Sequence, residues 1–144
     1  MAFQSEAKVE LELEEGFLKV KFNSENMNDI TIKLSQVSSE SIGAEARKLL
    51  AASLAKCMCS TLLFLLKWAR VKFEKFRAVA NVSVTKDEKG KLCVGEIKLK
   101  IHIKIPKDNE TLERFKKVEK IFKRGCLMSR SIERGIKVSY SIIT

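Results

Sequence analysis

The chain has 144 residues, of which 45% are hydrophobic, and this proportion excludes a disordered protein. It carries 28 Lys and Arg residues against 18 Asp and Glu residues, which gives a net charge of +10. Such a surplus fits an anionic partner, but the basic residues are scattered and interleaved with acids, as on a solvated surface. The length predicts a single domain over residues 1–144.

The first third of the chain predicts an antiparallel meander. Residues 8–14 alternate, with Val9, Leu11 and Leu13 on the inward face, and the alternation resumes at residues 17–22. Gly16 lies between these runs, which is the pattern of a β-hairpin. The outward acids of one strand face the outward lysines of the other. A third strand is expected at residues 30–34.

Residues 43–70 predict one long helix, with Ser41 or Gly43 as its N-cap. The helix is apolar nearly all round, so it needs cover on every side, and we expect a second copy of the chain to supply part of it. Its uncharged run, Cys57 to Leu66, is ten residues long, too short to span a membrane. The acidic N-terminus does not resemble an export signal, so the expected location is cytoplasmic.

The second half of the chain predicts further strands and helices. The period changes to alternation near Phe73, and Pro106 ends the later of two long strands. The expected elements are strands at 76–84 and 92–105, a helix at 109–124, a short helix at 126–135 and a final strand at 136–143. The fold class is therefore α+β.

Cysteine is the one reactive residue type in a notable arrangement. Cys57 and Cys59 lie about 200° apart around the helix, so they cannot pair with each other there. With one histidine and no second close cysteine pair, the chain predicts no zinc site. Cys93 is expected to be a small core residue of its strand. Burial in mid-helix predicts a raised pKa and an inert thiol at Cys57 taken alone.

Cys126 differs because it opens a short helix. Unsatisfied N–H groups and the helix dipole favour a thiolate there, and Arg124 and Arg130 are near in sequence. A reactive thiol and an ordinary buried cysteine both remain open on these grounds.

Two segments carry a family resemblance. LLAASLAKC, from Leu49 to Cys57, resembles the helix that carries the reactive cysteine in the OsmC and organic hydroperoxide resistance family. RGCLMSRSIERGIKVSY, from Arg124 to Tyr140, resembles the family's second motif, in which a cysteine opens a short helix before a final strand. The spacing of the two motifs and the order of elements also match, so the resemblance covers essentially the whole chain.

The resemblance implies an intertwined homodimer in which antiparallel sheets surround the long central helices. It also implies a thiol peroxidase that uses no metal or organic cofactor. In the implied reaction, Cys57 reduces an organic hydroperoxide and Cys126 then forms a disulfide with it. A dithiol reductant, lipoyl or thioredoxin-like, restores both thiols. Leu54, Met58 and Leu62 are expected to give Cys57 an apolar surrounding.

The chain departs from the family pattern around the first cysteine. Family peroxidases activate it with an N-terminal arginine and a glutamate near the helix start, whereas this chain has no arginine before Arg47. Arg47 stands in the place of the glutamate, and Glu45 lies two positions away. One hypothesis is that Arg47 of one subunit approaches Cys57 of the other. The alternative is that Arg47 is a surface residue.

Other residues of this chain also bear on how it differs from the family pattern. Lys19 or Lys21 is a candidate for the part of the missing arginine. In the second motif, Leu127 stands after Cys126 where the family usually has proline.

Two other functional classes stay open. The first is an OsmC-like protein without peroxidase activity that binds a ligand or uses its thiols otherwise, which the missing arginine and glutamate favour. The second is nucleic-acid binding along a basic strip on one strand. Trp68 and most phenylalanines fall on inward positions, so few aromatics are expected to stack on bases, and we do not expect a nucleic-acid partner. The strip consists of Lys98, Lys100, His102 and Lys104.

Overall fold

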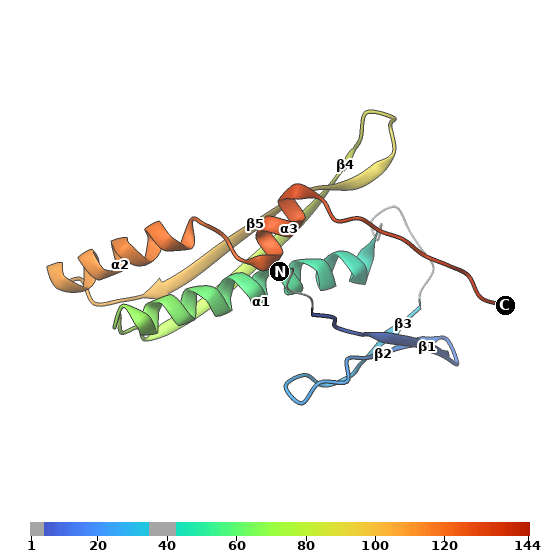
Figure 1. Cartoon of the computed structure of the whole chain (residues 1–144), viewed down its shortest axis with the longest axis horizontal. Helices are drawn as coiled ribbons and strands as arrows, with labels where there is room; N and C mark the ends of the chain where they lie inside the picture. The colour runs from blue at the N-terminus through green and yellow to red at the C-terminus, as the bar shows by residue number, and fades with distance from the viewer. Residues whose placement is uncertain (1–4, 35–42) are drawn as a thin grey trace. The chain divides into compact units, whose positions relative to one another are not determined.

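The computed structural model describes residues 5–34 and 43–144 (Figure 1). The chain divides into two compact units, the first ending at Glu45 and the second beginning at Ala46. The expected N-cap Ser41 lies outside the described residues, and Gly43 directly precedes the long helix.

The first unit contains a three-stranded antiparallel sheet. Its strands are β1 (Glu10–Glu14), β2 (Phe17–Lys21) and β3 (Ile30–Lys33), in the order β1-β2-β3, which confirms the predicted meander. Glu15 and Gly16 connect β1 to β2 with φ values of 44° and 86°. Two successive positive φ values are typical of the tight turn whose twist matches that of the hairpin strands.

One face of this sheet is less covered than the sequence predicts. Val20 of β2 is buried, but the supposedly inward side chains of Val9, Leu11 and Leu13 are exposed. The prediction for β1 was wrong for one copy of the chain, because the described part of this unit holds no helix or second sheet to cover that face. The predicted cross-strand charge pairing is confirmed, since Lys21 Nζ lies 3.2 Å from Glu12 Oε1.

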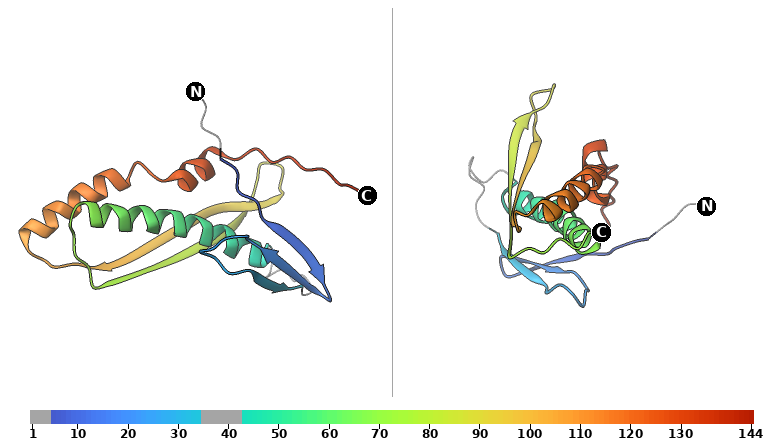
Figure 2. Two further views of the ribbon diagram at one scale, coloured as in Figure 1. Left: turned by 60° about the horizontal axis from the view of Figure 1, so that its bottom comes forward. Right: turned by 90° about the vertical axis from the view of Figure 1, so that its left-hand side faces the viewer.

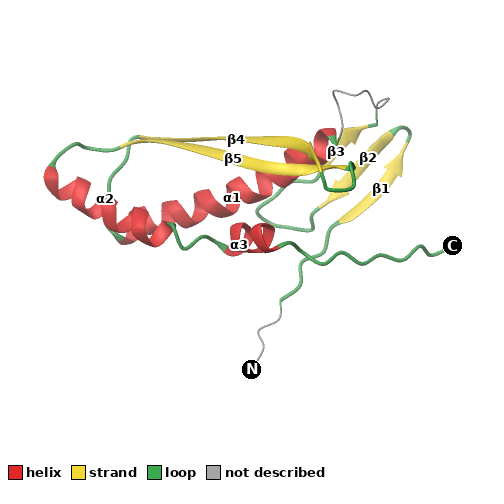
Figure 3. Cartoon of the chain, turned by 90° about the horizontal axis from the view of Figure 1, so that it is seen from above, coloured by secondary structure: helices red, strands yellow, loops and turns green. Residues whose placement is uncertain are grey.

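The second unit packs helices against a long hairpin. After α1 (Ala44–Trp68) come β4 (Lys75–Lys86) and β5 (Leu92–Lys104), and then α2 (Asn109–Phe122) and α3 (Leu127–Arg134). The hairpin runs along α1 (Figure 3), and α2 and α3 follow one another along the same helix (Figure 2).

The core of the second unit lies where α1, the hairpin and α2 meet. Leu66 and Val118 are completely buried at its centre. The inward apolar side chains of α2 all pack there, which confirms its amphipathic pattern. From β5, Ile101, Ile103 and Ile105 join this core, whereas Ile97 and Leu99 of the same face line a pocket. The partly buried members are Ala69, Phe76, Ile101, Ile103, Leu112, Phe115, Ile121 and Phe122.

A β-bulge interrupts the hairpin near its tip. Ser83 pairs with Glu96 and the next residue, Val84, pairs with Val94, so Gly95 is the extra residue. A Cβ atom on Gly95 would lie 2.6 Å from the side chain of Thr85, so only glycine fits there. Because one extra residue reverses the alternation beyond it, Cys93 lies on the outward face and is exposed. The prediction of a core position for Cys93 was wrong for this reason.

The long helix presents a broad apolar surface to solvent. Phe64 is 68% exposed, and Leu49, Leu63 and Trp68 are also exposed, so the prediction that Trp68 faces inward was wrong for one copy of the chain. By length and composition alone, α1 passes the test for a membrane-spanning helix. Ala51, Leu54, Leu62, Leu65 and Leu66 of this helix are buried against the rest of the second unit.

The last segment of the chain forms no strand in this copy. Residues 136–144 leave α3 as an extended trace (Figure 1). Their apolar side chains are exposed to solvent, and Tyr140 is 88% exposed. The predicted strand at 136–143 is therefore not formed within one described chain, because no described strand pairs with it.

Candidate functional site

The start of α3 holds the thiol of Cys126 in a capping box. Cys126 is the N-cap, and its Sγ accepts the backbone N–H of Ser129 at 3.4 Å. In return, the Oγ of Ser129 accepts the backbone N–H of Cys126 at 2.8 Å. Both residues are buried. The sulfur therefore occupies the place where a hydroxyl or carboxylate oxygen commonly caps a helix.

The turn before α3 depends on glycine and on an arginine. Gly125 has a φ of 79°, and a Cβ atom there would lie 2.7 Å from the Oγ of Ser129. The side chain of Arg130 donates to the carbonyl oxygens of Arg124 and Gly125, at 3.3 and 2.9 Å. Arg130 thus braces the backbone of the turn, while Arg124 is exposed. These contacts position the Cys126 thiol through the backbone.

The structure brings Cys57 and Cys126 together. Cys57 lies in the middle of α1, and its thiol is close enough to that of Cys126 for each to shift the pKa of the other, although 69 positions separate them in the sequence. The backbone N–H of Met128 also points at both sulfurs. Two thiols in contact are arranged for disulfide chemistry, because either one can attack the other once that partner is oxidised.

The two thiols differ in acidity. Burial raises the pKa of Cys57, and its hydrogen bond to Cys126 raises it further. Burial also opposes ionisation of Cys126, but hydrogen bonds from Cys57, Ser129 and Met128 outweigh it and lower the pKa of the Cys126 thiol. The helix start thus makes Cys126 the more acidic of the two thiols.

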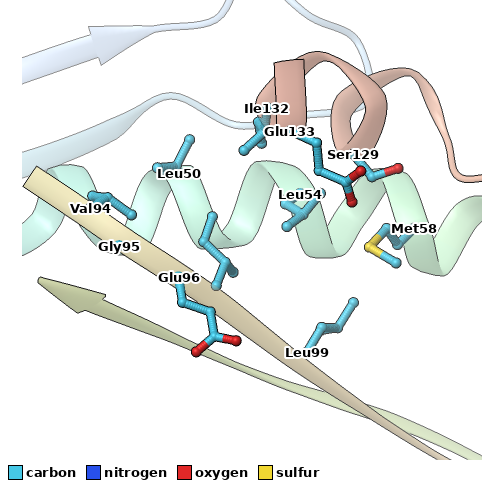
Figure 4. Close-up of a pocket in the computed structure, with 11 residues that line it drawn as sticks. Leu50, Leu54, Met58, Val94, Gly95, Glu96, Leu99, Ser129, Ile132 and Glu133 are labelled. Atoms are coloured by element: carbon cyan, nitrogen blue, oxygen red, sulfur yellow. The ribbon is translucent and has the colours of Figure 1, made fainter. Parts of the chain in front are cut away.

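An apolar pocket of about 620 Å³ opens beside this pair (Figure 4). It lies between α1, β5 and α3, and it includes Met58, next to Cys57, and Ser129, which caps Cys126. Two of the three apolar neighbours expected around Cys57, Leu54 and Met58, line it, whereas Leu62 belongs to the core. The other lining residues are Leu50, Val94, Gly95, Glu96, Ile97, Leu99, Ile132 and Glu133.

A known protein family matches most of this chain. The family model described as OsmC-like protein matches residues 38–141, and these include Cys57, Cys126 and the pocket. That match covers more than half of the sequence. The chain is an OsmC-like protein. No curated protein matches the sequence of this OsmC-like protein.

Solved structures share the fold of this OsmC-like protein. An OsmC-like protein of unknown function from Vibrio cholerae has a TM-score of 0.69 at 17% identity, with 90% of this chain and 95% of that chain covered. An OsmC-like protein from Mycoplasma pneumoniae has a TM-score of 0.67 at 15% identity, with coverages of 91% and 89%. These likenesses confirm the predicted α+β, OsmC-like fold with antiparallel sheets and a long helix.

A further solved relative has a name that refers to a function. An organic hydroperoxide resistance protein from Elizabethkingia anophelis has a TM-score of 0.51 at 19% identity, with 86% of this chain and 88% of that chain covered. At this identity the likeness establishes the fold alone.

The two supporting residues named from the sequence do not contact Cys57 within one chain. Arg47 Nη1 donates to the carbonyl oxygen of Val82 in β4 at 3.4 Å, and its buried Nε has no acceptor among residues 5–34 and 43–144. Glu45 is exposed in the first turn of α1, about 18 Å along the helix axis from Cys57. An approach of Arg47 to the partner subunit's thiol stays a prediction.

The remaining candidates have other surroundings. Lys21 is engaged by Glu12, and this hydrogen bond raises the pKa of the Lys21 ammonium. Cys59 is half-buried on α1, and burial raises the pKa of its thiol. In the part of the chain that the structure describes, no three His, Cys, Asp or Glu side chains gather as metal ligands.

Sequence reasoning missed Ser129 and the two carboxylates of the pocket, Glu96 and Glu133. The spacing of Cys126 and Ser129 contains a usable signal, because a capping box places a polar side chain three residues after the N-cap. The carboxylates had no such signal, since their position depends on the bulge at Gly95 and on how α3 packs.

The difference in acidity predicts a pH titration. Thiolate absorbance at 240 nm should reveal one thiol that ionises below the ordinary value of 9.0, and Cys126→Ser should remove this component. Because a lowered pKa means that the thiolate persists as the pH falls, the signal should survive to lower pH than that of free cysteine. Cys59→Ser is the matched control and should leave the component in place. Its loss in that control instead would contradict the assignment.

Proposed function

We propose that this OsmC-like protein is a thiol-dependent reductase of organic hydroperoxides that works through Cys57 and Cys126. The observation that carries the proposal is the contact between the two thiols beside an apolar pocket. The family, some of whose solved members are named hydroperoxide resistance proteins, supports the same chemistry.

The proposed reaction proceeds in two oxidative steps. The Cys57 thiolate attacks the terminal oxygen of the hydroperoxide, the O–O bond breaks, and the alkoxide takes a proton and leaves as the alcohol. Cys57 is then a sulfenic acid. The Cys126 thiolate attacks its sulfur, hydroxide leaves and is protonated to water, and a Cys57–Cys126 disulfide forms. The lowered pKa of Cys126 increases the thiolate fraction of this second nucleophile at a given pH.

A homodimer in the cytoplasm is part of the proposal. The bare apolar face of α1 and the unpaired, apolar segment 136–143 support the dimer, because both need a partner surface. We propose that this segment adds as a strand to the sheet of a partner copy, and that the whole chain acts as one domain. A dithiol protein of the cytoplasm, lipoyl or thioredoxin-like, is the proposed reductant.

A second function is favoured by the acidity of the thiols. Because the pKa of Cys57 is raised and the pocket has no Lys or Arg among its lining residues, the chain has the features of an OsmC-like protein that binds an apolar ligand without reducing it. Of the two functions, only the reductase would consume hydroperoxide over repeated catalytic cycles.

Peroxide consumption by the pure protein with excess dithiothreitol tests the proposal. We expect turnover with cumene hydroperoxide, and about tenfold or more slower turnover with hydrogen peroxide, because burying an aryl group in an apolar pocket contributes roughly 1.5–3 kcal/mol. Consumption no faster than with dithiothreitol alone would reject the reductase. Retained binding of cumyl alcohol by calorimetry would then support the ligand-binding function.

A further inference from the structure

The two cysteines of the Cys57–Cys126 pair differ in exposure to solvent. This difference affects which sulfur a reductant attacks when the disulfide is reduced. Cys126 is 5% exposed and Cys57 is half-buried. A reductant that enters from solvent therefore reaches the sulfur of Cys57 more readily. The pocket beside the pair gives a route, since Met58, which follows Cys57, forms part of its wall.

The helix start favours departure of the other sulfur. The N–H of Ser129 lies 3.4 Å from the Sγ of Cys126, and the N–H of Met128 points to the same atom. These donors belong to the backbone of α3, so they remain when the two sulfurs are joined. A thiolate that forms on Cys126 is accepted at once by hydrogen bonds and by the positive end of the helix.

Thiol–disulfide exchange proceeds faster when the better-stabilised thiolate leaves and the more accessible sulfur is attacked. In this site both conditions favour attack on the sulfur of Cys57 and departure of Cys126. We propose that the reductant attacks the Sγ of Cys57, that Cys126 is the leaving group, and that Ser129 is the positioning residue that fixes this direction. The inference rests on the proposed function only in requiring a Cys57–Cys126 disulfide.

Reduction of the disulfide takes two successive exchange steps. One thiolate of a dithiol reductant bonds to the Sγ of Cys57, the Cys57–Cys126 bond breaks, and its electron pair stays on Cys126. The second thiol of the reductant, after losing its proton, then attacks the reductant's own sulfur in the mixed disulfide. Cys57 leaves as a thiolate and takes up a proton, and the reductant departs as a disulfide. The docking contact of the reductant is thus with the pocket side of α1.

The test uses a variant in which only the pair remains. Cys59→Ser and Cys93→Ser together leave two of the four cysteines. Diamide oxidises the pair without any peroxide, so the test is independent of the proposed reductase activity. The disulfide is then exposed briefly to 2-mercaptoethanesulfonate, quenched with acid and treated with N-ethylmaleimide. Tryptic peptides 57–67 and 125–130 report separately on the two cysteines by mass spectrometry.

We expect the monothiol on Cys57 and the maleimide on Cys126, in about tenfold excess over the reverse arrangement at early times. Equal amounts, or a monothiol adduct mainly on Cys126, would overturn the inference. Failure of diamide to join the two cysteines would overturn it too. A protein that fails to consume peroxide but gives the Cys57 adduct would refute the reductase and leave the inference standing.

Ser129 is tested by the same ratio of adducts. Ser129→Ala removes the hydroxyl that holds the N-cap, so the preference for Cys57 should shrink several-fold, and Ser129→Thr should restore it. Ser131→Ala is the matched control, because its hydroxyl donates to the backbone carbonyl of Leu127 in the same helix at 2.7 Å and does not cap Cys126. If Ser129→Ala keeps the wild-type ratio while Cys126 still pairs with Cys57, Ser129 does not set the direction.

Discussion

Replacement of Cys57 with serine is expected to lower dithiol-dependent consumption of cumene hydroperoxide at least about 100-fold, to the background of free dithiol. Serine keeps the size and the hydrogen bond to Cys126 but lacks a sulfur that peroxide can oxidise. Cys59→Ser is the matched control, since Cys59 is half-buried on the same helix and its pKa is also raised by burial. A loss of activity that is equal in both variants would contradict the role of Cys57.

Cys126→Ser separates the two oxidative steps. In this variant Cys57 should still become a sulfenic acid, which dimedone traps and mass spectrometry detects, but no intramolecular disulfide should follow. A sulfenic acid found on Cys126 in the Cys57→Ser variant, with none on Cys57 in the Cys126→Ser variant, would contradict this assignment. It would mean that Cys126 attacks the peroxide and that Cys57 then forms the disulfide.

The same reaction should have a characteristic pH dependence. Because the pKa of Cys57 is raised above 9.0, its thiolate is a minor form at neutral pH and grows as the pH rises. The rate of the first peroxide-dependent oxidation should therefore rise about tenfold for each pH unit between pH 7 and pH 8.5. A rate that is flat over this range would mean that a partner subunit or another group lowers the pKa in the working protein.

A charge on the exposed apolar face of α1 is expected to dissociate the proposed dimer. Phe64→Glu replaces a side chain that is exposed in one chain with a carboxylate that the dimer would have to bury. Burying an unpaired charge costs several kcal/mol, so the dissociation constant should rise at least about 100-fold. Sedimentation velocity over a dilution series measures it.

The control for this variant must carry the same charge change elsewhere. Asn81→Glu also turns a neutral, exposed residue into a carboxylate, but it lies on the outward face of β4, opposite Lys98. It should leave the mass unchanged. A protein that sediments with the mass of one chain before any substitution would refute the dimer. Dissociation by both variants to the same extent would place the interface elsewhere.

Patterns that are local in the sequence predicted most of the fold. The alternation in residues 17–21 and 97–105, and the helical periodicity of residues 109–122, each depend on neighbouring side chains only, and the structure confirms them. The inward face of β1, the inward position of Trp68 and the strand at residues 136–143 were also predicted, but one chain provides neither the cover nor the neighbouring strand that they require. Periodicity indicates which side of an element is apolar, but it does not indicate whether the same chain covers that side.

The candidate site was predictable to a different degree. The resemblance named Cys57 and Cys126, whose catalytic roles stay predictions. The acidity of the pair was not accessible from spacing, because it depends on where the N–H groups of Met128 and Ser129 point. The arginines near Cys126 in sequence were misleading, since Arg130 braces backbone carbonyls instead of the thiol.

The extra residue at Gly95 has a consequence for how this family of sites can change. Beyond the bulge, Val94 faces the pocket and Cys93 faces away from it. Inserting one residue between Ser83 and Val84 of β4 would give Gly95 a partner, restore strict alternation in β5, exchange these two side chains and bring a third sulfur to the wall beside Cys57 and Cys126. The number of thiols that compete for one oxidised sulfur is thus set here by the length of a strand, and the insertion of one residue in β4 changes it without altering any cysteine codon.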